Sequence, residues 1–345
     1  MSRSQIVSLL LLSGALLFPF SSVWSFKGST VQGSTIRGLL LVANKGDQSL
    51  SIVDPASGQQ LATVAEGGVT GHEVIASPDG RMAYVPIYGN SGVGRPGTDG
   101  SNLVVIDIAA RKVVGNIDFG QGVRPHCPMF GPKDGLLYVT TEITNSVTVI
   151  DPGTLKIVGT IPTGQAESHM LAITRNGQRG YTANVGPGTV SVLDLKTRKT
   201  ITIIPVAPVI QRIALSIDDR LAFTADQTKP QLAVIDTATN KIKRLVALPD
   251  IGYGAAPTPD GRWLVIAVPK ANKVAAIDLR TMKVAHTFEV PSAPQEVVMR
   301  PDGREAYVSC DASGKIAVLN LSEWKIDKLI DAGKGADGLA WAAVK

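Results

Sequence analysis

Three of the four histidines in this 345-residue sequence occupy the same position in an internal repeat. His72 lies six residues before the proline of a Ser-Pro-Asp-Gly turn, and His126 and His169 lie at the same interval from the equivalent turns of the next two repeats. Neutral imidazole nitrogens are good ligands for Zn, Mn, Ni or Cu. If the repeats converge, these three side chains form a candidate site for a divalent metal. The alternative is that each imidazole satisfies a backbone group at the start of its own strand.

The same position in the remaining repeats carries other polar side chains. It is occupied by Gln211, Tyr253, Gln295 and, in the final strand, Asp337. With Tyr88, these first three residues are predicted to contact a ligand, and Gln211 could also add an oxygen to a metal or orient a water molecule. His286, the fourth histidine, falls in an outer strand.

Charged residues beside these positions suggest two further roles. Arg124 and Arg212 could hold an anionic substrate. Glu142 and Glu167 are candidate general bases, because the register places them near His126 and His169. The alternative for each of these charges is a solvated surface position.

The repeat itself is defined by seven β runs that end in Asp or Asn. They end at Asp54, Asp107, Asp151, Asp194, Asp236, Asp278 and Asn320, at intervals of 53, 44, 43, 42, 42 and 42 residues. A period near 42 residues with four short strands per repeat is typical of β-propeller blades. The residue four positions later is Gly or Asn in only two repeats, so the sequence does not require a uniform turn geometry there.

The ends of the repeat predict how the ring closes. The chain begins in the middle of a blade, and the apolar segment 338–344 supplies the missing innermost strand. We therefore predict an all-β, seven-bladed propeller in which the C-terminal strand joins the three N-terminal strands. The expected blades are 38–66 plus 337–345, 67–120, 121–163, 164–206, 207–249, 250–291 and 292–334. Cys127 and Cys310 fall four blades apart and are expected to be free thiols.

Several phrases resemble a known family of repeats. SPDGRMAYV (77–85), RPDGREAYVS (300–309) and YTANVGPGTVSVLD (181–194) are similar to the YVTN-type propeller repeat. The resemblance covers roughly residues 38–345 and implies an exported seven-bladed propeller. Related propellers include surface-layer modules, lactonase-like enzymes, amine dehydrogenase heavy chains and metal-dependent lyases, so the resemblance leaves the activity open.

The N-terminus reads as a targeting segment. Arg3 precedes the 13-residue apolar stretch 6–18, and Val23-Trp24-Ser25 fits a cleavage site. The stretch is shorter than a membrane-spanning helix, so we expect a signal peptide over 1–25, a flexible leader over 26–37 and no transmembrane segment after cleavage. The predicted location is periplasmic or secreted.

Composition excludes several classes of function. The net charge of +5 comes from 34 basic and 29 acidic residues without a clustered basic stripe, so no nucleic-acid partner is expected. Nucleotide-binding, haem and nucleophile-elbow motifs are absent. No cofactor is implied with certainty, a divalent metal is the one candidate, and the chain is expected to be a monomer.

Repeat 2 carries an insertion, YGNSGVGRPGTDGS (88–101), on the histidine side of the ring. Long loops on a regular scaffold commonly serve as lids or partner-binding arms, the alternative being a tolerated insertion. The leading hypothesis is a binding or interaction module that takes a small molecule, a polymer or a protein over the channel mouth. The alternative is a metal-dependent lyase or a lactonase-like hydrolase that uses the histidines.

Overall fold

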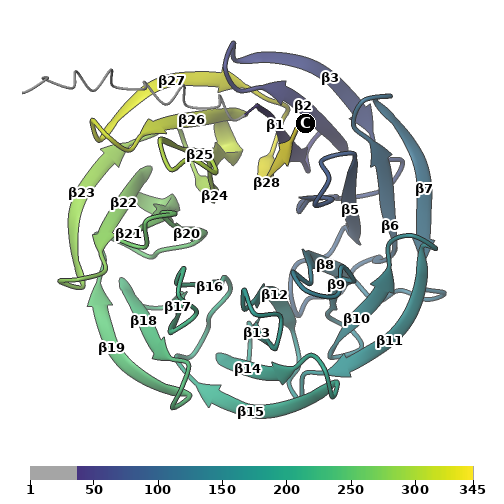
Figure 1. The fold of residues 1–345 in the computed structure, drawn as a ribbon, viewed down its shortest axis with the longest axis horizontal. Coiled ribbons are helices and arrows are strands. Elements are labelled where there is room, and N and C mark those ends of the chain that lie inside the picture. Colours follow the sequence, from purple (N-terminus) through teal and green to yellow (C-terminus); the bar gives the residue numbers. More distant parts are fainter. Residues whose placement is uncertain (1–36, 345) are drawn as a thin grey trace, which may run out of the picture. The chain divides into compact units, whose positions relative to one another are not determined.

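The computed structural model describes residues 37–344, which form a ring of seven four-stranded antiparallel sheets around a central channel (Figure 1). This confirms the predicted all-β, seven-bladed propeller. In every blade the first strand lies at the channel and the fourth at the rim. The predicted signal peptide and leader fall outside the described residues, apart from Arg37.

In blades 2 to 7 the strands follow the chain from channel to rim, and in blade 1 the C-terminal strand β28 lies inside β1, β2 and β3. Blade 1 consists of β28 (Ala336–Ala343), β1 (Gly38–Asn44), β2 (Ser49–Asp54) and β3 (Gln59–Ala65). Blade 2 consists of β4 (Ile75–Ala76), β5 (Met82–Gly89), β6 (Asp99–Asp107) and β7 (Lys112–Asp118). Blade 3 consists of β8 (Pro125–Phe130), β9 (Leu137–Thr141), β10 (Ser146–Asp151) and β11 (Lys156–Pro162). Blade 4 consists of β12 (Ser168–Ile173), β13 (Arg179–Asn184), β14 (Thr189–Asp194) and β15 (Lys199–Pro205).

The remaining three blades repeat the same order. Blade 5 consists of β16 (Ala214–Leu215), β17 (Leu221–Ala225), β18 (Gln231–Asp236) and β19 (Lys241–Ala247). Blade 6 consists of β20 (Ala255–Pro257), β21 (Trp263–Val268), β22 (Lys273–Asp278) and β23 (Lys283–Glu289). Blade 7 consists of β24 (Pro294–Met299), β25 (Glu305–Cys310), β26 (Lys315–Asn320) and β27 (Lys325–Asp331).

The ring closes as the sequence predicts. Strand β28 pairs antiparallel with β1, with Leu41 opposite Ala340 and Val42 opposite Leu339. The last strand of the chain thereby completes the blade that the first three strands begin. Closure leaves no blade short of a strand and joins the two ends of the described chain in one sheet.

The turns between the third and fourth strands are more regular than the sequence suggests. The expectation that their geometry need not be uniform is wrong. All seven residues at the turn position, including Arg111 and Trp324, have φ between 52° and 75°. The preceding carboxylate accounts for this, since it accepts a backbone N–H two or three residues on, as Asp54 does from Ala56 at 3.0 Å. Strand pairing and this bond override the local preference for Gly or Asn.

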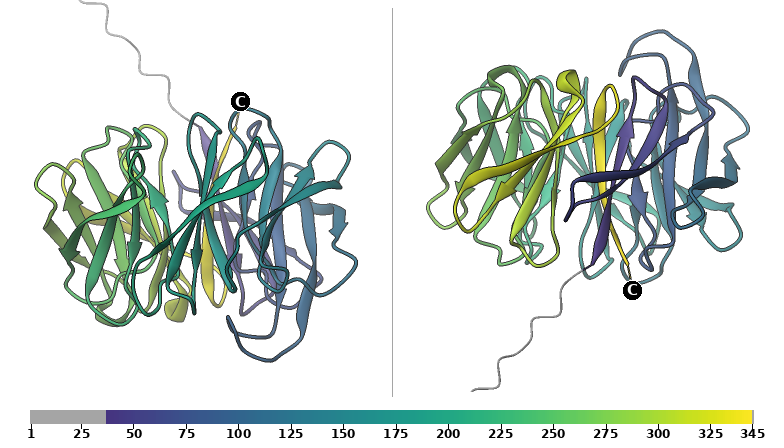
Figure 2. Two further views of the ribbon diagram at one scale, coloured as in Figure 1. Left: turned by 90° about the horizontal axis from the view of Figure 1, so that it is seen from below. Right: turned by 90° about the horizontal axis from the view of Figure 1, so that it is seen from above.

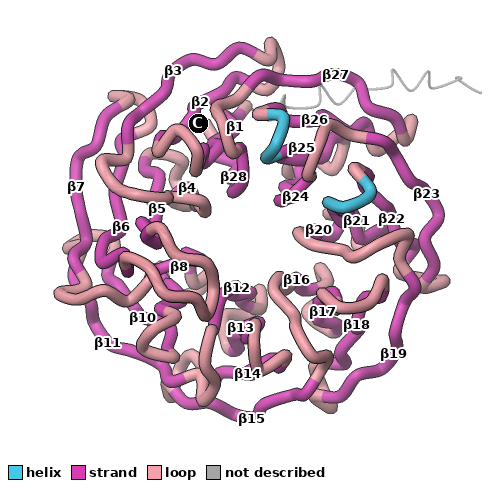
Figure 3. The backbone as a smooth tube through the Cα atoms, turned by 180° about the vertical axis from the view of Figure 1, so that it is seen from behind, coloured by secondary structure: helices cyan, strands magenta, loops and turns pink. Residues whose placement is uncertain are grey.

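Almost the whole described chain is strand or loop. The two short helices drawn in Figure 3 are the 3₁₀ turns η1 (Pro269–Ala271) and η2 (Asp311–Ser313). No helix among residues 37–344 is long and apolar enough to cross a membrane. Cys127 and Cys310 are buried and free, in agreement with the prediction.

Apolar side chains pack between neighbouring blades and hold the ring together. A cluster that spans blades 3, 4 and 5 includes Tyr138, Tyr181 and Ile235, all nearly or fully buried. Burying large side chains on both faces of a small sheet is what makes each blade depend on its neighbours.

Strands β5 and β6 are longer than their counterparts, and the loop between them extends past the neighbouring strands on one face of the ring (Figure 2). This is the insertion of repeat 2. It folds toward blade 3, where the guanidinium of Arg124 donates hydrogen bonds to the carbonyl oxygens of Gly92 and Arg95 at 3.3 and 2.7 Å.

Candidate functional site

Irregular pairing at the start of the inner strands lets two consecutive residues reach the channel. In β8 the pairing skips from Pro125 to Pro128, so that His126 and Cys127 share Thr140 as their neighbour on β9. The hydroxyl of Thr140 accepts the Cys127 N–H at 2.9 Å, which replaces the lost ladder bond. Such β-bulges re-aim side chains and are common beside functional sites.

The same irregularity recurs in three other blades. In blade 4 the pairing of β12 skips the residue between Ser168 and Met170. In blade 7 the pairing of β24 skips the two residues between Pro294 and Val297. In blade 1 the pairing of β28 with β1 shifts between Val42 and Asn44 of β1.

In blades 2, 5 and 6 the register residues His72, Gln211 and Tyr253 precede the inner strands β4, β16 and β20. We describe the side chains that reach the channel as two successive layers. The upper layer is the register position that carries the histidines, and the lower layer is the residue that follows each of them.

The upper layer brings the three predicted histidines together. The ring centroids of His126 and His169 lie 3.5 Å apart with an interplanar angle of 31°, and His72 lies 4.5 Å from His126 and 6.5 Å from His169. His126 and His169 are each 1% exposed. Tyr88 packs its ring edge-on against all three imidazoles, with centroids 5.2 to 6.1 Å away.

The imidazole nitrogens of this cluster have few partners among the described residues. Three of these nitrogens make no hydrogen bond with the described residues: Nδ1 and Nε2 of His126 and Nδ1 of His169. The Nε2 of His169 lies 3.5 Å from the Nε2 of Gln211. Burial lowers the pKa of both His126 and His169 well below the ordinary value, and neighbouring imidazoles and Arg212 lower it further. Both rings are therefore neutral, the form that binds metals.

Asp337 and Lys45 lie on the other side of His72. The Nδ1 of His72 is 3.4 Å from a carboxylate oxygen of Asp337, and the same oxygen is 3.2 Å from the Lys45 ammonium. Burial favours the neutral acid, but His72, Lys45 and Arg212 together hold the pKa of Asp337 below its usual range. Asp337 is thus an anion that can orient His72 as a ligand.

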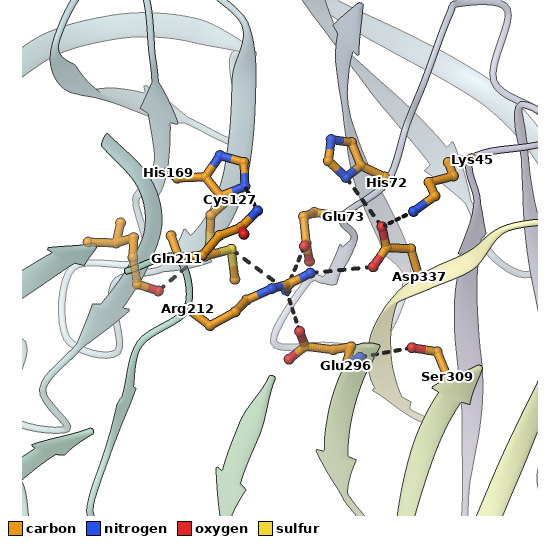
Figure 4. A network of polar contacts seen from close by, with 12 residues as sticks. Lys45, His72, Glu73, Cys127, His169, Gln211, Arg212, Glu296, Ser309 and Asp337 are labelled. Carbon is orange, nitrogen blue, oxygen red and sulfur yellow. Dashed lines mark hydrogen bonds and ion pairs between the residues drawn. The ribbon is translucent and has the colours of Figure 1, made fainter. Parts of the chain in front are cut away.

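Arg212 crosses the channel in the lower layer (Figure 4). It comes from blade 5, and its guanidinium meets Glu73 of blade 2 at 2.7 Å, Asp337 of blade 1 at 3.4 Å and Glu296 of blade 7. It also lies 4.7 Å above the ring of Tyr253. Arg212 and these carboxyls form a layer that closes the channel beneath the histidines.

Both arginines that were expected to hold an anionic substrate already pair with carboxylates of the protein. Arg212 is 4% exposed and faces three carboxyls. Arg124 is equally buried and pairs with Asp99 at 2.6 Å and with Glu142 at 3.1 Å. Both guanidinium groups are therefore paired with carboxylates, although Arg124 also lines a pocket and the Nε of Arg212 has no hydrogen-bond partner among the described residues. Their role in holding an anionic substrate stays a prediction.

The two predicted bases are also engaged elsewhere. The Glu142 carboxylate accepts hydrogen bonds from the Tyr88 hydroxyl and, at 3.0 Å, from the Gly94 N–H. Glu167 accepts the Gly186 N–H at 2.7 Å. The carboxyls that lie beside the histidines are Glu73 and Asp337 instead. Glu142 contacts the imidazoles only through the Tyr88 ring. Gln295, a predicted ligand-binding residue, donates a hydrogen bond to the carbonyl oxygen of Ala293 at 3.3 Å.

One group of side chains has the composition of a metal site. A ligand atom from each of His72, Glu73 and His126 lies within 4.8 Å of the others. The group contains two of the three predicted ligands, His72 and His126, and adds the carboxyl of Glu73, whereas His169 lies outside the group and packs against His126 at a tilt of 31°. Two imidazoles, a carboxyl and a third imidazole in contact suit Zn, Mn, Ni or Cu.

Sequence reasoning missed Glu73 and Glu296. Each directly follows a register residue, His72 or Gln295, and in a regular strand consecutive side chains point to opposite faces. Glu296 lies in the irregularly paired stretch of β24, and Glu73 precedes β4, which begins at Ile75, so neither follows the alternation of a regular strand. One feature of the sequence could have revealed them. The residue after the register position is Glu73 in blade 2, Arg212 in blade 5 and Glu296 in blade 7, and charged residues of opposite sign at equivalent positions indicate an ion-pair network.

The ring of seven four-stranded blades defines this chain as a seven-bladed β-propeller. No family profile and no curated protein matches the chain by sequence. Solved structures share its fold. A hydrazine synthase from Kuenenia stuttgartiensis is 18% identical with a TM-score of 0.71, over 85% of this chain and 99% of that one. A periplasmic gluconolactonase from Pseudomonas aeruginosa is 16% identical with a TM-score of 0.71, over 89% and 99%.

A third such structure is a functionally unknown protein from Desulfotomaculum acetoxidans, 14% identical with a TM-score of 0.72 over 89% of this chain and 99% of that one. At these identities the likeness shows the fold alone. The activity has to be argued from the residues of this channel.

Proposed function

We propose that this protein is a binding module whose channel mouth holds a divalent transition-metal ion on His72, His126 and His169. The observation that carries the proposal is the pair of buried, neutral imidazoles of His126 and His169, three of whose four ring nitrogens have no hydrogen-bond partner among the described residues. Buried polar atoms without partners are unfavourable by roughly 1–3 kcal/mol each. A metal ion would supply the missing partner.

The distances in the cluster support an ion of this kind. Ligand atoms at ~2.0–2.1 Å from a tetrahedral Zn²⁺ lie ~3.3 Å from one another. Ligand atoms of His72, Glu73 and His126 lie within 4.8 Å of one another, so these side chains would move together on binding an ion, and His169 would have to turn toward it from its place against His126. Asp337, paired with the Nδ1 of His72, would fix the ring orientation and leave Nε2 free to bind.

Elemental analysis tests the proposal. Protein dialysed against Zn²⁺ and then against metal-free buffer should retain about one equivalent. His126→Ala should retain less than a tenth of that amount. His286→Ala, which removes the histidine of outer strand β23, is the matched control and should bind like the unaltered protein. Zinc retention that is absent from the unaltered protein, or equal in His126→Ala, would refute the proposal.

The ligand is expected to be a small molecule, a polymer or a protein segment that reaches the metal over the channel mouth. Tyr88 packs against all three imidazoles and connects them through Glu142 to the loop of blade 2. This arrangement supports the role of the loop as the element that recognises the ligand.

The Glu73 carboxyl favours a second candidate function, an enzyme that acts on a lactone or a similar carbonyl compound. A metal ion on the histidines would polarise the carbonyl group, and Glu73 would act as the general base, because its carboxyl lies within 4.8 Å of nitrogens of His72 and His126. The test is the hydrolysis of glucono-δ-lactone by metal-loaded protein. A hydrolysis rate above that in buffer, lost in Glu73→Gln, would support the enzyme. A rate equal to that in buffer would contradict the enzyme and favour the binding module.

We further propose that the protein is an exported, monomeric member of the YVTN-type group of propellers, on the strength of its N-terminal pattern and its repeat phrases. Export predicts a periplasmic or secreted chain that begins near Phe26. N-terminal sequencing of protein from the periplasmic or culture fraction tests this, because an intact Met1 in a cytoplasmic fraction would exclude export.

A further inference from the structure

The part of the channel beyond the Arg212 layer is a separate cavity of about 580 Å³. Side chains from all seven inner strands line it, and none of the three clustered histidines does. Its volume lies in the range of pockets that hold small molecules. It is therefore a second candidate site on the opposite side of the Arg212 layer from the histidines.

The walls of this cavity are apolar. They include Val74, Met170, Leu171, Ala214, Val297 and Leu339. Ala172 and Ala214 each lie two residues beyond Met170 and Arg212, both of which reach the channel, so alternation along the strands turns their methyl groups toward its axis. Such walls suit the hydrocarbon part of a ligand.

Two carboxyls lie at the inner end, or floor, of the cavity, and the other charged residues that line it among the described ones, Arg175 and Asp219, lie at its outer end in the turns after β12 and β16. Glu73 and Glu296 both line the cavity and share one cation, since both contact the same Nη1 of Arg212. The second nitrogen of that guanidinium faces Asp337. Three carboxyls thus surround one guanidinium, and of these three Lys45 pairs with Asp337 alone. Burial raises the pKa of both Glu73 and Glu296, so a cation placed between these two carboxyls would favour their ionised forms.

We propose that this cavity binds a small amphipathic primary amine, with its ammonium group between Glu73 and Glu296 and its hydrocarbon body along the apolar wall. An ammonium supplies a positive charge and three N–H donors. A carboxylate of the same length would meet two carboxyls, and Arg212 is already occupied by its partners. The site therefore discriminates by charge at the floor and by shape along the wall.

The test is calorimetric titration of the purified protein with n-hexylammonium, hexanoate and hexanol. Hexylammonium should bind, and the other two should bind at least roughly tenfold weaker, since tenfold corresponds to about 1.4 kcal/mol. Glu296→Gln removes one floor charge with little change in shape and should weaken hexylammonium by roughly tenfold or more. Ala172→Leu narrows the wall and should weaken both hexylammonium and hexanol.

Three results would overturn the inference. They are no heat with hexylammonium at millimolar concentration, hexanoate binding as tightly as hexylammonium, and an unchanged affinity in Glu296→Gln with a native circular dichroism spectrum. His126→Ala serves as the control for the proposed metal site and should leave amine binding unchanged. Glu73 belongs to both sites, so the titration is made on metal-free protein, and Glu296→Gln, which lies outside the metal group, should leave zinc retention unchanged. The failure of one site is thereby distinguishable from the failure of the other.

Discussion

The imidazoles of His126 and His169 come from neighbouring blades, yet their ring centroids lie only 3.5 Å apart in a buried position. Two imidazolium ions could not occupy these positions, because their charges would repel in a poorly solvated site. Both imidazoles are therefore neutral, and each has one unprotonated nitrogen that can bind a metal ion at the channel mouth. That relationship is the basis of the proposed metal site.

Replacement of Arg212 by Met should destabilise the protein by about 3–5 kcal/mol at pH 7, because it leaves Glu73, Glu296 and Asp337 without their shared cation. The loss should shrink at lower pH, since burial raises the pKa of Glu296 and protonation then removes the repulsion. Urea unfolding measures both effects. Arg220→Met, at an exposed arginine in a surface turn, is the control and should change stability by less than about 0.5 kcal/mol. A loss below 1 kcal/mol in Arg212→Met would contradict this account of the channel.

Deletion of residues 336–345 should open the ring, because it removes β28 from blade 1 and exposes the edge of β1. The melting temperature should fall by roughly 10 °C or more, or the cooperative transition should disappear. Deletion of residues 344–345 alone keeps β28 and is the matched control. Equal melting temperatures for the two truncated proteins would show that strand closure does not stabilise the ring.

Arg111→Gly should stabilise the protein by about 1 kcal/mol. Arg111 is exposed and has φ of 56°, a left-handed conformation that is unfavourable for residues with a Cβ atom. Lys112→Gly, at the next residue in strand β7, should instead destabilise by about 0.5–1 kcal/mol. Thermal unfolding of the two variants tests whether Arg111→Gly is stabilised and Lys112→Gly destabilised. A lower stability of Arg111→Gly would mean that the Arg111 side chain stabilises the protein by more than its left-handed backbone conformation costs.

Glu66 should make the protein less stable as pH rises toward 8. The side chain is buried, and burial raises the pKa of its carboxyl from 4.5 to about 8. Between these values the unfolded chain has released the proton that the folded chain keeps, so stability falls by up to about 1.4 kcal/mol per pH unit. Below pH 4.5 both states are protonated and the contribution is fully present.

Glu66→Gln removes that titration. Its stability relative to the unaltered protein should rise between pH 4.5 and 8 and then level off, as followed by urea unfolding at a series of pH values. Glu289→Gln, at an exposed residue of strand β23, is the control. A constant difference between Glu66→Gln and the unaltered protein over this range would show that Glu66 does not titrate in this way.

The sequence predicted the ring, its closure and the meeting of three histidines, because these follow from a repeat of nearly constant length. One position in each repeat maps to one height in the channel, so His72, His126 and His169 had to lie at the same level. The fourth histidine, His286, could be assigned to the outer strand by the same reasoning.

The sequence did not reveal which carboxyls approach the imidazoles. Alternation in a regular strand places Glu73 and Glu296 away from the channel. Glu296 instead lies in an irregularly paired stretch of β24, and Glu73 lies before the start of β4, so the alternation rule applies to neither. Likewise, the contacts of Arg124 and Glu142 depend on how the blade 2 loop folds over blade 3, which its Gly-rich sequence does not specify.

X-ray absorption of the Zn²⁺-loaded protein tests the central claim most directly, because it reports the atoms bound to the metal. The account predicts imidazole scattering, with nitrogen ligands at ~2.0–2.1 Å that are lost in His126→Ala and retained in His286→Ala. A first shell of oxygen atoms alone, or one that His126→Ala leaves unchanged, would contradict a metal site at the channel mouth.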